Sequence, residues 1–419
     1  MRFIKRNLYS DIKNHLSKKE ITLIIGARQV GKTTIMKQLQ KELTQKGERT
    51  VFFNLDREMD KKYFESQSLL LRKIELEIGR KNGFVFIDEI QRKENAGLFL
   101  KGIYDSDLPY KFIVSGSGSL ELKEKIHESL IGRKKIFELT PISVDEFINF
   151  KTNYKYENNI VDFFEIEKEK ASLILEEYLN YGGYPKVVLA ETEKEKMEEI
   201  DEIFRSYLER DITYLIRTDR IDVFSILIKL LAAQTGELIN YSKLSTYLNT
   251  SIQTIKNYLW LAEKTFIIKK ITPYFTNPQK EITKSPIYYF YDIGLRNYGI
   301  SKFGKLSQIE LGFAFENIIL NILQEKIRLT PATIHFWRTK EKAEVDFILN
   351  YTTQIVPIEV KYKHFKQPTI TRSMRSFIEK YNPKTAFIIN LNLETIVKID
   401  KTEVKFIPFY ILLQTKIAG

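Results

Sequence analysis

The chain has 419 residues, of which 43% are hydrophobic and 29% charged, so it is long enough for two to four folded domains and unlike disordered or collagen-like chains. It contains no Cys and only four His, which excludes disulfides, thiol nucleophiles and thiolate zinc sites and argues against a multi-histidine metal site. The formal net charge of +12 favours polyanionic partners such as nucleic acid.

The sequence contains no recognisable targeting or membrane-spanning segment. Its first residues, MRFIKRNLYSDIKNHL, alternate charged with apolar side chains and lack the continuous apolar stretch of a secretion signal. No apolar run approaches the ~20 residues that cross a bilayer, and the longest runs, such as residues 406–413, fit buried strands. We therefore expect a cytoplasmic protein that makes no contact with a membrane.

A phosphate-binding loop follows the first predicted strand. Residues 22–25 are apolar or β-branched, as in a strand covered on both faces, and a helical apolar pattern begins after residue 34. Between them lies the spacing G-x-x-x-x-G-K-T, whose backbone N–H groups bind phosphate oxygens. The residues assigned to ATP are Gly26, Gly31, Lys32, Thr33 and Thr34, with Lys32 at the β and γ phosphates and Thr33 at Mg²⁺. The alternative is a chance glycine loop.

Acidic and small polar residues end the next predicted strands. Asp88 and Glu89 follow the strand at residues 84–87; Asp88 would hold Mg²⁺ and Glu89 would polarise an attacking water, so the pair predicts hydrolysis. Ser115, after the strand at residues 111–114, is a sensor candidate, although a flexible Ser-Gly turn explains it nearly as well. Arg133, before a fifth strand at residues 135–139, could stabilise transition-state charge in its own or a neighbouring subunit, or be a surface residue.

A helical lid is expected next. Residues 151–170 are rich in charge and indicate a solvated connector that leads into helices. Gly183, Tyr184 and Pro185 would break a helix and present a rigid apolar corner that suits an adenine ring. A turn between helices accounts for these three residues equally well.

Three helices and a β-ribbon are predicted after the lid. The helices cover residues 224–231, residues 241–248 and a third segment capped by Ser251, whose apolar stripe is Ile252, Ile255, Leu259 and Ala262; the ribbon pairs residues 266–271 with 287–291. This order is that of a winged helix, whose third helix commonly enters the DNA major groove. Candidate DNA contacts on its polar side are Gln253, Lys256 and Asn257. The alternative is a rigid spacer attached to the ATPase.

Acidic residues in the last third of the chain predict a metal-dependent nuclease site. Glu316 lies on the apolar side of a helix at residues 306–324, where an unpaired carboxylate needs a cation. In the strand at residues 343–349, Asp346 is expected to face away from Val345, Phe347 and Leu349. Glu359 and Lys361 share a face of the strand at residues 355–362.

These groups suit metal-assisted phosphodiester cleavage. The carboxylates Glu316, Asp346 and Glu359 could bind Mg²⁺ or Mn²⁺, which would activate water, while Lys361 orients it or offsets negative charge. The spacing resembles the restriction-endonuclease-like PD-(D/E)xK superfamily, with Val345 where the motif has Pro and a following helix and strand in its order. The alternative is an edge strand with alternating charges.

Taken together, GARQVGKTT, FVFIDEIQ, the SGSGS turn, GR before a fifth strand, LNYGGYP and EVDFI…PIEVK resemble a prokaryotic family of AAA-like P-loop ATPases allied to the STAND signalling ATPases. The resemblance implies the sheet order of the additional-strand-catalytic-glutamate class (ASCE) and contact of Gly183-Tyr184-Pro185 with adenine. It also implies a C-terminal winged helix and a PD-(D/E)xK-like domain.

The expected fold is α/β, with a P-loop ATPase of ASCE type at residues 1–150, a helical lid at 151–217, a winged helix at 218–300 and a smaller restriction-endonuclease-like α/β domain at 301–419. We expect ATP hydrolysis coupled to DNA binding and to cleavage by the nuclease-like domain. The alternative is a STAND-like nucleotide switch whose C-terminal domain binds DNA or protein without cleavage. A homo-oligomer is compatible with either function.

Overall fold

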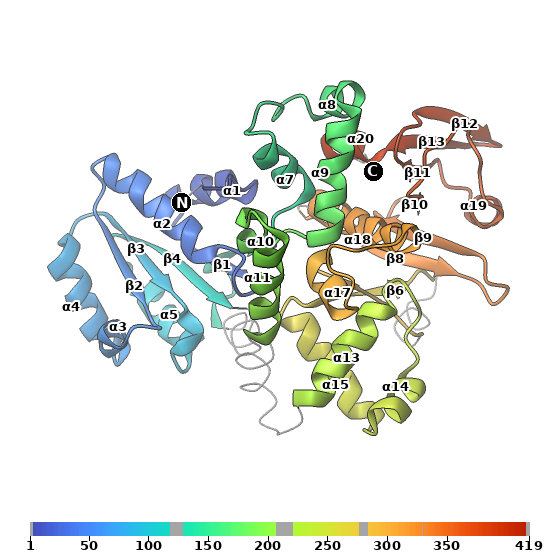
Figure 1. Cartoon of the computed structure of the whole chain (residues 1–419). Coiled ribbons are helices and arrows are strands. Elements are labelled where there is room, and N and C mark those ends of the chain that lie inside the picture. Colours follow the sequence, from blue (N-terminus) through green and yellow to red (C-terminus); the bar gives the residue numbers. More distant parts are fainter. Residues whose placement is uncertain (1–2, 118–128, 207–220, 276–283, 329, 416–419) are drawn as a thin grey trace.

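Two β-sheets with helices between them make up the structure (Figure 1). The computed structural model describes residues 3–117, 129–206, 221–275, 284–328 and 330–415. Helices α10 and α11 lie between the N-terminal sheet and the helices of the C-terminal half. Within the described residues, no helix combines the length and the apolar character that crossing a bilayer requires.

The N-terminal sheet has five parallel strands in the order β2-β3-β4-β1-β5, which agrees with the order that the resemblance implies. The strands are β1 (Ile21–Gly26), β2 (Thr50–Asn54), β3 (Gly83–Asp88), β4 (Tyr110–Ser117) and β5 (Lys134–Leu139). Every residue of β1 and β4 is buried, which explains the nearly continuous apolar sequence of β1 and the apolar centre of β4. All five carboxyl ends therefore meet at one edge, where the P-loop lies.

Helices and 3₁₀ turns connect these strands. The helices are α1 (Leu8–Asn14), α2 (Lys32–Gln45), α3 (Glu58–Lys61), α4 (Gln67–Ile78) and α5 (Ala96–Asp105). The 3₁₀ turns are His15–Ser17, Lys62–Phe64 and Ile90–Arg92. Their apolar faces bury an aromatic core in which the rings of Phe53 and Phe64 lie 5.7 Å apart.

The expected helical segment after the N-terminal sheet is present. It comprises α7 (Val144–Lys151), α8 (Ile160–Ile166), α9 (Lys168–Tyr181), α10 (Pro185–Leu189) and α11 (Glu193–Ser206). The solvated connector expected at residues 151–170 is wrong in part, because α8 lies within it. Phe163 and Phe164 on α8 are buried, and Phe164 stacks on Tyr410 at 4.8 Å. The local excess of charge hid this aromatic pair.

The break at Gly183-Tyr184-Pro185 is a close contact between backbones. Gly182 ends α9 with φ 75°, and Pro185 begins α10, as its fixed φ favours. The Gly183 carbonyl accepts a hydrogen bond from Ile142 N at 2.7 Å, and a Cβ on Gly183 would lie 2.1 Å from the Ile142 oxygen. Position 183 therefore requires glycine, because any Cβ would overlap the Ile142 carbonyl oxygen.

The predicted three helices and ribbon are also present. They are α13 (Ile221–Ala233), α14 (Tyr241–Leu248), α15 (Ile252–Lys264), β6 (Ile268–Pro273) and β7 (Ile287–Phe290), followed by α17 (Ile293–Gly299). Ser251 caps α15, as expected, by accepting from Thr254 N at 3.0 Å. The predicted apolar stripe fails only at Ile252, which is 39% exposed because it is the first residue of the helix.

The ribbon joins the C-terminal sheet instead of standing apart. Strands β8 (Thr333–Arg338), β9 (Glu344–Asn350), β10 (Ile355–Val360), β11 (Thr385–Asn390), β12 (Thr395–Ile399) and β13 (Thr402–Pro408) continue the order β12-β13-β11-β10-β9-β8-β6-β7. The junction is parallel pairing of Thr272 with His335 and of Pro273 with Phe336. One sheet therefore crosses the boundary expected near residue 300.

Three helices pack on this sheet: α18 (Gln308–Ile327), α19 (Arg372–Tyr381) and α20 (Phe409–Gln414). The strand expected at residues 406–413 is wrong in its second half, because β13 ends at Pro408 and α20 follows. Phe409, Tyr410 and Leu412 are buried on that helix. A short apolar run does not distinguish a buried strand from a buried helical turn.

Gly183→Ala should destabilise the protein by about 2–4 kcal/mol, because the new Cβ would collide with the Ile142 carbonyl. Urea denaturation measures this change in the free energy of unfolding. Gly312→Ala on α18 is the matched control, since no atom lies within 4 Å of its added Cβ, and it should be neutral or stabilise by about 0.5–1 kcal/mol. Equal stabilities of the two variants would contradict the steric argument.

Candidate functional site

The P-loop has the geometry of an anion-binding turn before a helix. A Cβ on Gly26 would lie 2.1 Å from the Leu139 oxygen, and Gly31 takes φ 100° as the residue before α2, so both positions require glycine. Lys32 is the first residue of α2, and its Nζ donates to the carbonyls of Gly26 at 3.0 Å and Ala27 at 2.6 Å. The loop thus brings an ammonium group to the helix N-terminus, where phosphate oxygens bind.

Asp88 is the polar centre of the neighbouring strand end. Its carboxylate is fully buried and accepts from Thr33 Oγ1 at 2.7 Å and from the hydroxyl of Ser115. Asn54, at the end of β2, also donates to it at 3.4 Å. Thr33 and Asp88 therefore meet as predicted, and their hard oxygen donors fit Mg²⁺. Asn54 was not singled out from the sequence, although its place at a strand end was a usable signal.

Ser115 contacts Asp88 from within the sheet. Strand β4 continues to Ser117, so Ser115, Gly116 and Ser117 belong to the strand and not to a turn; Gly118 and Ser119 lie outside the described residues. The Ser115 hydroxyl donates to Asp88 and accepts from Glu89 N at 3.3 Å. Its position thus orients the acidic pair, whereas contact with the γ-phosphate stays a prediction.

Glu89 takes a left-handed backbone conformation with φ 60°. Its carboxylate accepts from Gln91 Nε2, and Gln91 Oε1 accepts in turn from Ser117 N at 3.2 Å. Burial raises the pKa of Glu89, Lys32 opposes this rise, and the charge of Asp88 adds to it. Glu89 thus combines a strained backbone with a carboxylate that is fixed by a hydrogen bond and partly desolvated. These properties suit a residue that polarises water.

A cavity of about 610 Å³ joins the P-loop to the lid. Its polar end is lined by Arg28, Lys32, Thr33, Thr34 and Glu89. Its apolar end is lined by Phe3, Ile4, Ile142, Pro185 and Leu189. Of the three residues expected at the adenine, Pro185 lines this end of the cavity, whereas Gly183 and Tyr184 are not among its lining residues; contact of Pro185 with adenine stays a prediction. The N-terminal residues Phe3 and Ile4 were missed, because no local pattern connects them to a loop that begins more than twenty residues later.

Arg133 lies at the wrong end of the sheet for its own P-loop. Its carbonyl accepts from Ile21 N at 2.9 Å, at the amino end of β1, whereas the P-loop follows the carboxyl end. Its guanidinium pairs with Asp105 at 2.7 Å. The expectation that Arg133 stabilises transition-state charge within its own subunit is therefore wrong.

The C-terminal candidates converge from a helix and two strands. On α18, Glu316 accepts from the Tyr289 hydroxyl at 2.6 Å. On β9, Asp346 accepts from Val360 N at 2.7 Å. Glu359, 3% exposed on β10, pairs with Lys361 at 2.9 Å and accepts from Thr371 Oγ1 at 2.7 Å.

An irregular register places Asp346 beside Glu316. Strand β8 pairs His335 with Ile348 but Trp337 with Val345, so β9 carries one extra residue. Val345 consequently packs with Trp337, on the opposite side from Phe347, and the expected common face of Val345, Phe347 and Leu349 is wrong. Asp346 instead lines a cleft of about 500 Å³ together with Glu316.

The cleft is acidic. Burial raises the pKa of Glu316, and the charge of Asp346 raises it further; burial also raises the pKa of Asp346, which Lys361 opposes. Glu344, which was not predicted, lines the same cleft and forms an ion pair with Arg338 at 3.5 Å. The oxygen donors suit Mg²⁺ or Mn²⁺ chemically, yet the described part of the chain brings no three His, Cys, Asp or Glu side chains together as metal ligands.

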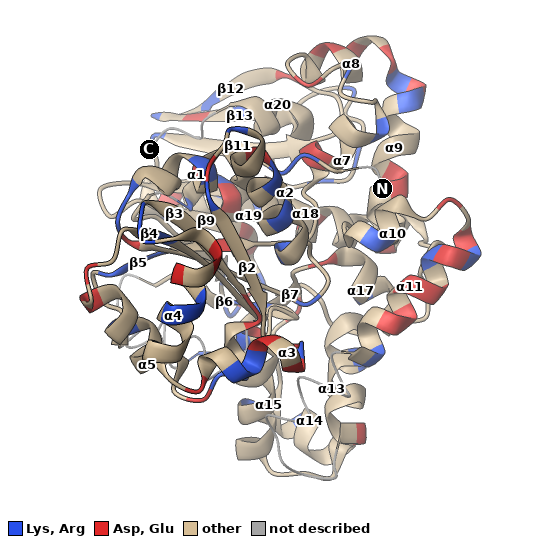
Figure 2. Ribbon diagram, turned by 90° about the vertical axis from the view of Figure 1, so that its left-hand side faces the viewer, with Lys and Arg blue, Asp and Glu red and all other residues tan. Residues whose placement is uncertain are grey.

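The DNA-contact candidates lie on the exposed side of α15. Gln253 Nε2 donates to Asn257 Oδ1 at 3.1 Å, and the Lys256 ammonium lies 5.4 Å from the centre of the Tyr241 ring. Figure 2 shows few charged residues on α13, α14 and α15, whereas α11 alternates both signs. The positive net charge is therefore not concentrated on the helix expected to bind DNA.

Residues 18–148 match the family model described as "AAA domain". Residues 172–305 match a "Domain of unknown function (DUF8612)", and residues 311–412 match a "Domain of unknown function (DUF4143)". Residues 18–148 are therefore similar in sequence to AAA domains, and the P-loop and the parallel sheet agree with this similarity.

Relatives cover most of the chain. An uncharacterized protein of Mycobacterium tuberculosis is 25% identical over 376 residues, covering 89% of this chain and 76% of that protein. One from Haemophilus influenzae is 26% identical and covers 82% of each, and one from Methanocaldococcus jannaschii is 27% identical and covers 81% of this chain and 74% of that protein.

Two solved structures show weak similarity to this chain. AMPPCP-bound DnaA from Aquifex aeolicus is 14% identical with a TM-score of 0.29, over 64% of this chain and 90% of that chain. Cdc6p from Pyrobaculum aerophilum is 10% identical with a TM-score of 0.27, over 72% of this chain and 96% of that chain. Scores at this level support no further statement about this protein.

Glu89→Gln should bind ATP within about threefold of the wild-type affinity and hydrolyse it about 100-fold or more slowly, because an amide cannot polarise water as a base. Calorimetric ATP binding and phosphate release measure the two effects. Asp56→Asn is the control, since this exposed carboxylate at the same sheet edge pairs with Arg92 at 2.8 Å and should be dispensable. Wild-type hydrolysis by Glu89→Gln would exclude the assigned role.

Proposed function

We propose that this protein is a Mg²⁺-dependent ATPase whose nucleotide site controls a DNA-directed C-terminal half. The observation that carries the ATPase proposal is the contact between Thr33 and Asp88 at 2.7 Å, next to Lys32 and Glu89 at one cavity. Magnesium, when bound by Thr33 and Asp88, supplies charge that offsets the phosphate oxygens.

The chain's own residues divide the work of hydrolysis. Lys32 and the N-terminus of α2 bind the β and γ phosphates, and Ser115 keeps the Asp88 carboxylate in place through its hydroxyl. Glu89 takes the proton of the attacking water, and its raised pKa brings it closer to neutral pH. Pro185 and Leu189 exclude water from the base end of the cavity.

DNA binding is proposed for the three helices and ribbon that resemble a winged helix. Exposed Gln253, Lys256 and Asn257 on α15 present donors and acceptors, and Trp260 beside them is 40% exposed. Such a mixture suits contacts to bases and phosphates, although the sparse charge predicts modest affinity. The net charge of +12 on the whole chain adds a long-range attraction to polyanions.

Metal-dependent DNA cleavage is a second candidate function. The observation in its favour is the convergence of Glu316 and Asp346 on one cleft, with the Glu359–Lys361 pair on the adjoining strand. The fold of this half is proposed to be PD-(D/E)xK-like. Against preformed cleavage chemistry, both oxygens of Glu359 already accept hydrogen bonds, from Lys361 and Thr371.

The alternative is a STAND-like switch in which the C-terminal half binds DNA or protein without cutting. The Lys361 ammonium balances the charge of Glu359 without a metal ion, so these two residues are also stable as a structural ion pair. The two alternatives differ in one outcome, which is the cleavage of DNA by the purified protein with ATP and Mg²⁺ or Mn²⁺.

Lys256→Ala should weaken DNA binding by about 3- to 10-fold at moderate salt and lower the slope of log affinity against log salt by about 1, because one phosphate contact is lost. Fluorescence anisotropy across a salt series, with and without ATP, measures both. Lys37→Ala, an exposed lysine on α2, is the control. An unchanged salt slope in Lys256→Ala would remove α15 from the DNA interface.

Asp346→Asn should abolish cleavage of supercoiled, linear, branched or single-stranded DNA, with a loss of about 100-fold or more, while ATP hydrolysis stays at the wild-type rate. Gel assays with Mg²⁺ or Mn²⁺ give the first result and phosphate release gives the second. Glu403→Gln on β13 controls for loss of an acidic side chain in the same sheet. No cleavage by the wild type favours the non-cleaving switch, whereas cleavage that persists in Asp346→Asn would contradict the role assigned to Asp346.

A further inference from the structure

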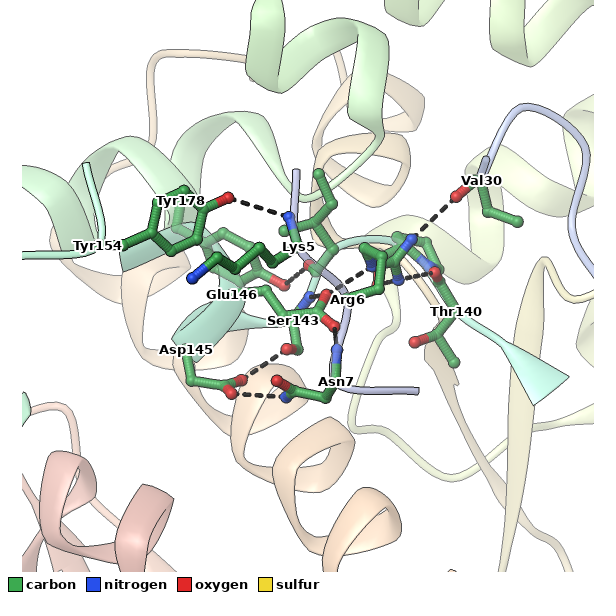
Figure 3. Close-up of polar contacts among 12 residues, drawn as sticks. Lys5, Arg6, Asn7, Val30, Thr140, Ser143, Asp145, Glu146, Tyr154 and Tyr178 are labelled. Carbon is green, nitrogen blue, oxygen red and sulfur yellow. Dashed lines mark hydrogen bonds and ion pairs between the residues drawn. The ribbon is translucent and has the colours of Figure 1, made fainter. Parts of the chain in front are cut away.

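The N-terminal segment before α1 contacts the P-loop through one buried arginine, which lines the same cavity as Val30 and Gly31 (Figure 3). Arg6 Nη1 donates to the Val30 carbonyl at 2.9 Å, and Nη2 donates to the carbonyls of Thr140 at 2.6 Å and Pro141 at 3.2 Å. Nε donates to Glu146 Oε2 at 2.8 Å. A single guanidinium thus connects the P-loop, the segment after β5 and the first turn of α7.

This arrangement is fully paired although it is buried. Arg6 is 8% and Glu146 4% exposed. The Glu146 carboxylate also accepts from Asn7 N at 2.6 Å and from Ser143 N at 3.1 Å, so the ion pair retains hydrogen bonds around both charges. Lysine could not replace the arginine. The guanidinium directs several N–H donors in one plane toward acceptors on three separate segments, whereas a single ammonium cannot reach all of them.

The contact with Val30 bears on nucleotide binding because of peptide geometry. The peptide bond between Val30 and Gly31 is planar and trans, so a carbonyl directed at Arg6 makes the Gly31 N–H point the opposite way. Gly31 is the second glycine of the P-loop and lines the nucleotide cavity. Because glycine with φ 100° also tolerates other conformations, the loop itself does not prevent this peptide from rotating.

We propose that Arg6 is a positioning residue for nucleotide binding, which holds the Val30–Gly31 peptide so that the Gly31 N–H faces the phosphates. This inference rests on the proposed ATPase function. Through Thr140, Pro141 and Glu146, the same side chain also fixes the connection from the sheet to the lid relative to the loop. The role is indirect, since Arg6 acts on the phosphates through the backbone.

Arg6→Lys should raise the KM for ATP and the Kd of ATP by about 10- to 100-fold, the effect of losing hydrogen bonds from a charged group, with kcat within about threefold of wild type. The split is expected because the Gly31 N–H contacts phosphate both before and during reaction. Assays run well below the melting temperature, with circular dichroism confirming the fold, separate this effect from a loss of stability. Hydrogen exchange of residues 26–34 should rise in the same variant.

Arg80→Lys is the control, because Arg80 also pairs with a carboxylate in this domain, Glu75 at 3.1 Å, but lies before the amino end of β3; its KM should not change. If Arg6→Lys does not fold, Glu146→Gln weakens the ion pair that orients the Arg6 guanidinium, and the KM for ATP should rise several-fold. A folded Arg6→Lys or Glu146→Gln variant with the wild-type KM overturns the inference. Failure of the wild type to bind ATP would instead refute the proposed function, so the two failures are distinguishable.

Discussion

The buried carboxylate of Asp292 connects the two halves of this protein. It caps α17 by accepting from Leu295 N at 2.9 Å and also accepts from Gly183 N at 2.7 Å, in the corner that leads to Pro185. Burial raises the pKa of Asp292 to about 6 although its backbone partners oppose the rise. Because a buried carboxylate requires hydrogen-bond donors, the Asp292 side chain depends on the N–H groups of Gly183 and Leu295. Asp292 therefore holds α17 and the corner between Gly183 and Pro185 together.

Asparagine side chains extend this unit in both directions. Asn297 Nδ2 donates to the Leu179 carbonyl at 2.8 Å, which satisfies the end of α9, and Asn317 on α18 bonds both the N–H and the carbonyl of Phe290 at 2.8 Å. The side-chain amide of Asn317 therefore binds the end of strand β7. These contacts replace backbone hydrogen bonds that would otherwise be lost where elements end in a buried place.

Features set by local sequence were predictable, and features set by distant contacts were not. The buried strands, the P-loop, Asp88 and the Ser251 cap follow from patterns within a few residues. Asn54, Phe3 and the Arg6 network depend on segments far apart in the chain, and α8 was obscured by its charged surroundings. Asp346 was found as an acidic residue in a strand, but its side of the sheet depends on an extra residue in β9 that alternation cannot reveal.

A continuous set of contacts links the two candidate sites. Pro185 lines the cavity beside the P-loop, Gly183 binds Asp292, and residues 289–292 bind α18 through Glu316 and Asn317. Proximity alone does not establish coupling, which requires an element with two arrangements. Because the junction is buried, hydrogen-bonded and closely packed at Gly183 and Gly294, it favours displacement as a rigid body over local deformation. A nucleotide signal that reaches Glu316 would therefore move the lid, α17 and α18 together relative to the ATPase sheet.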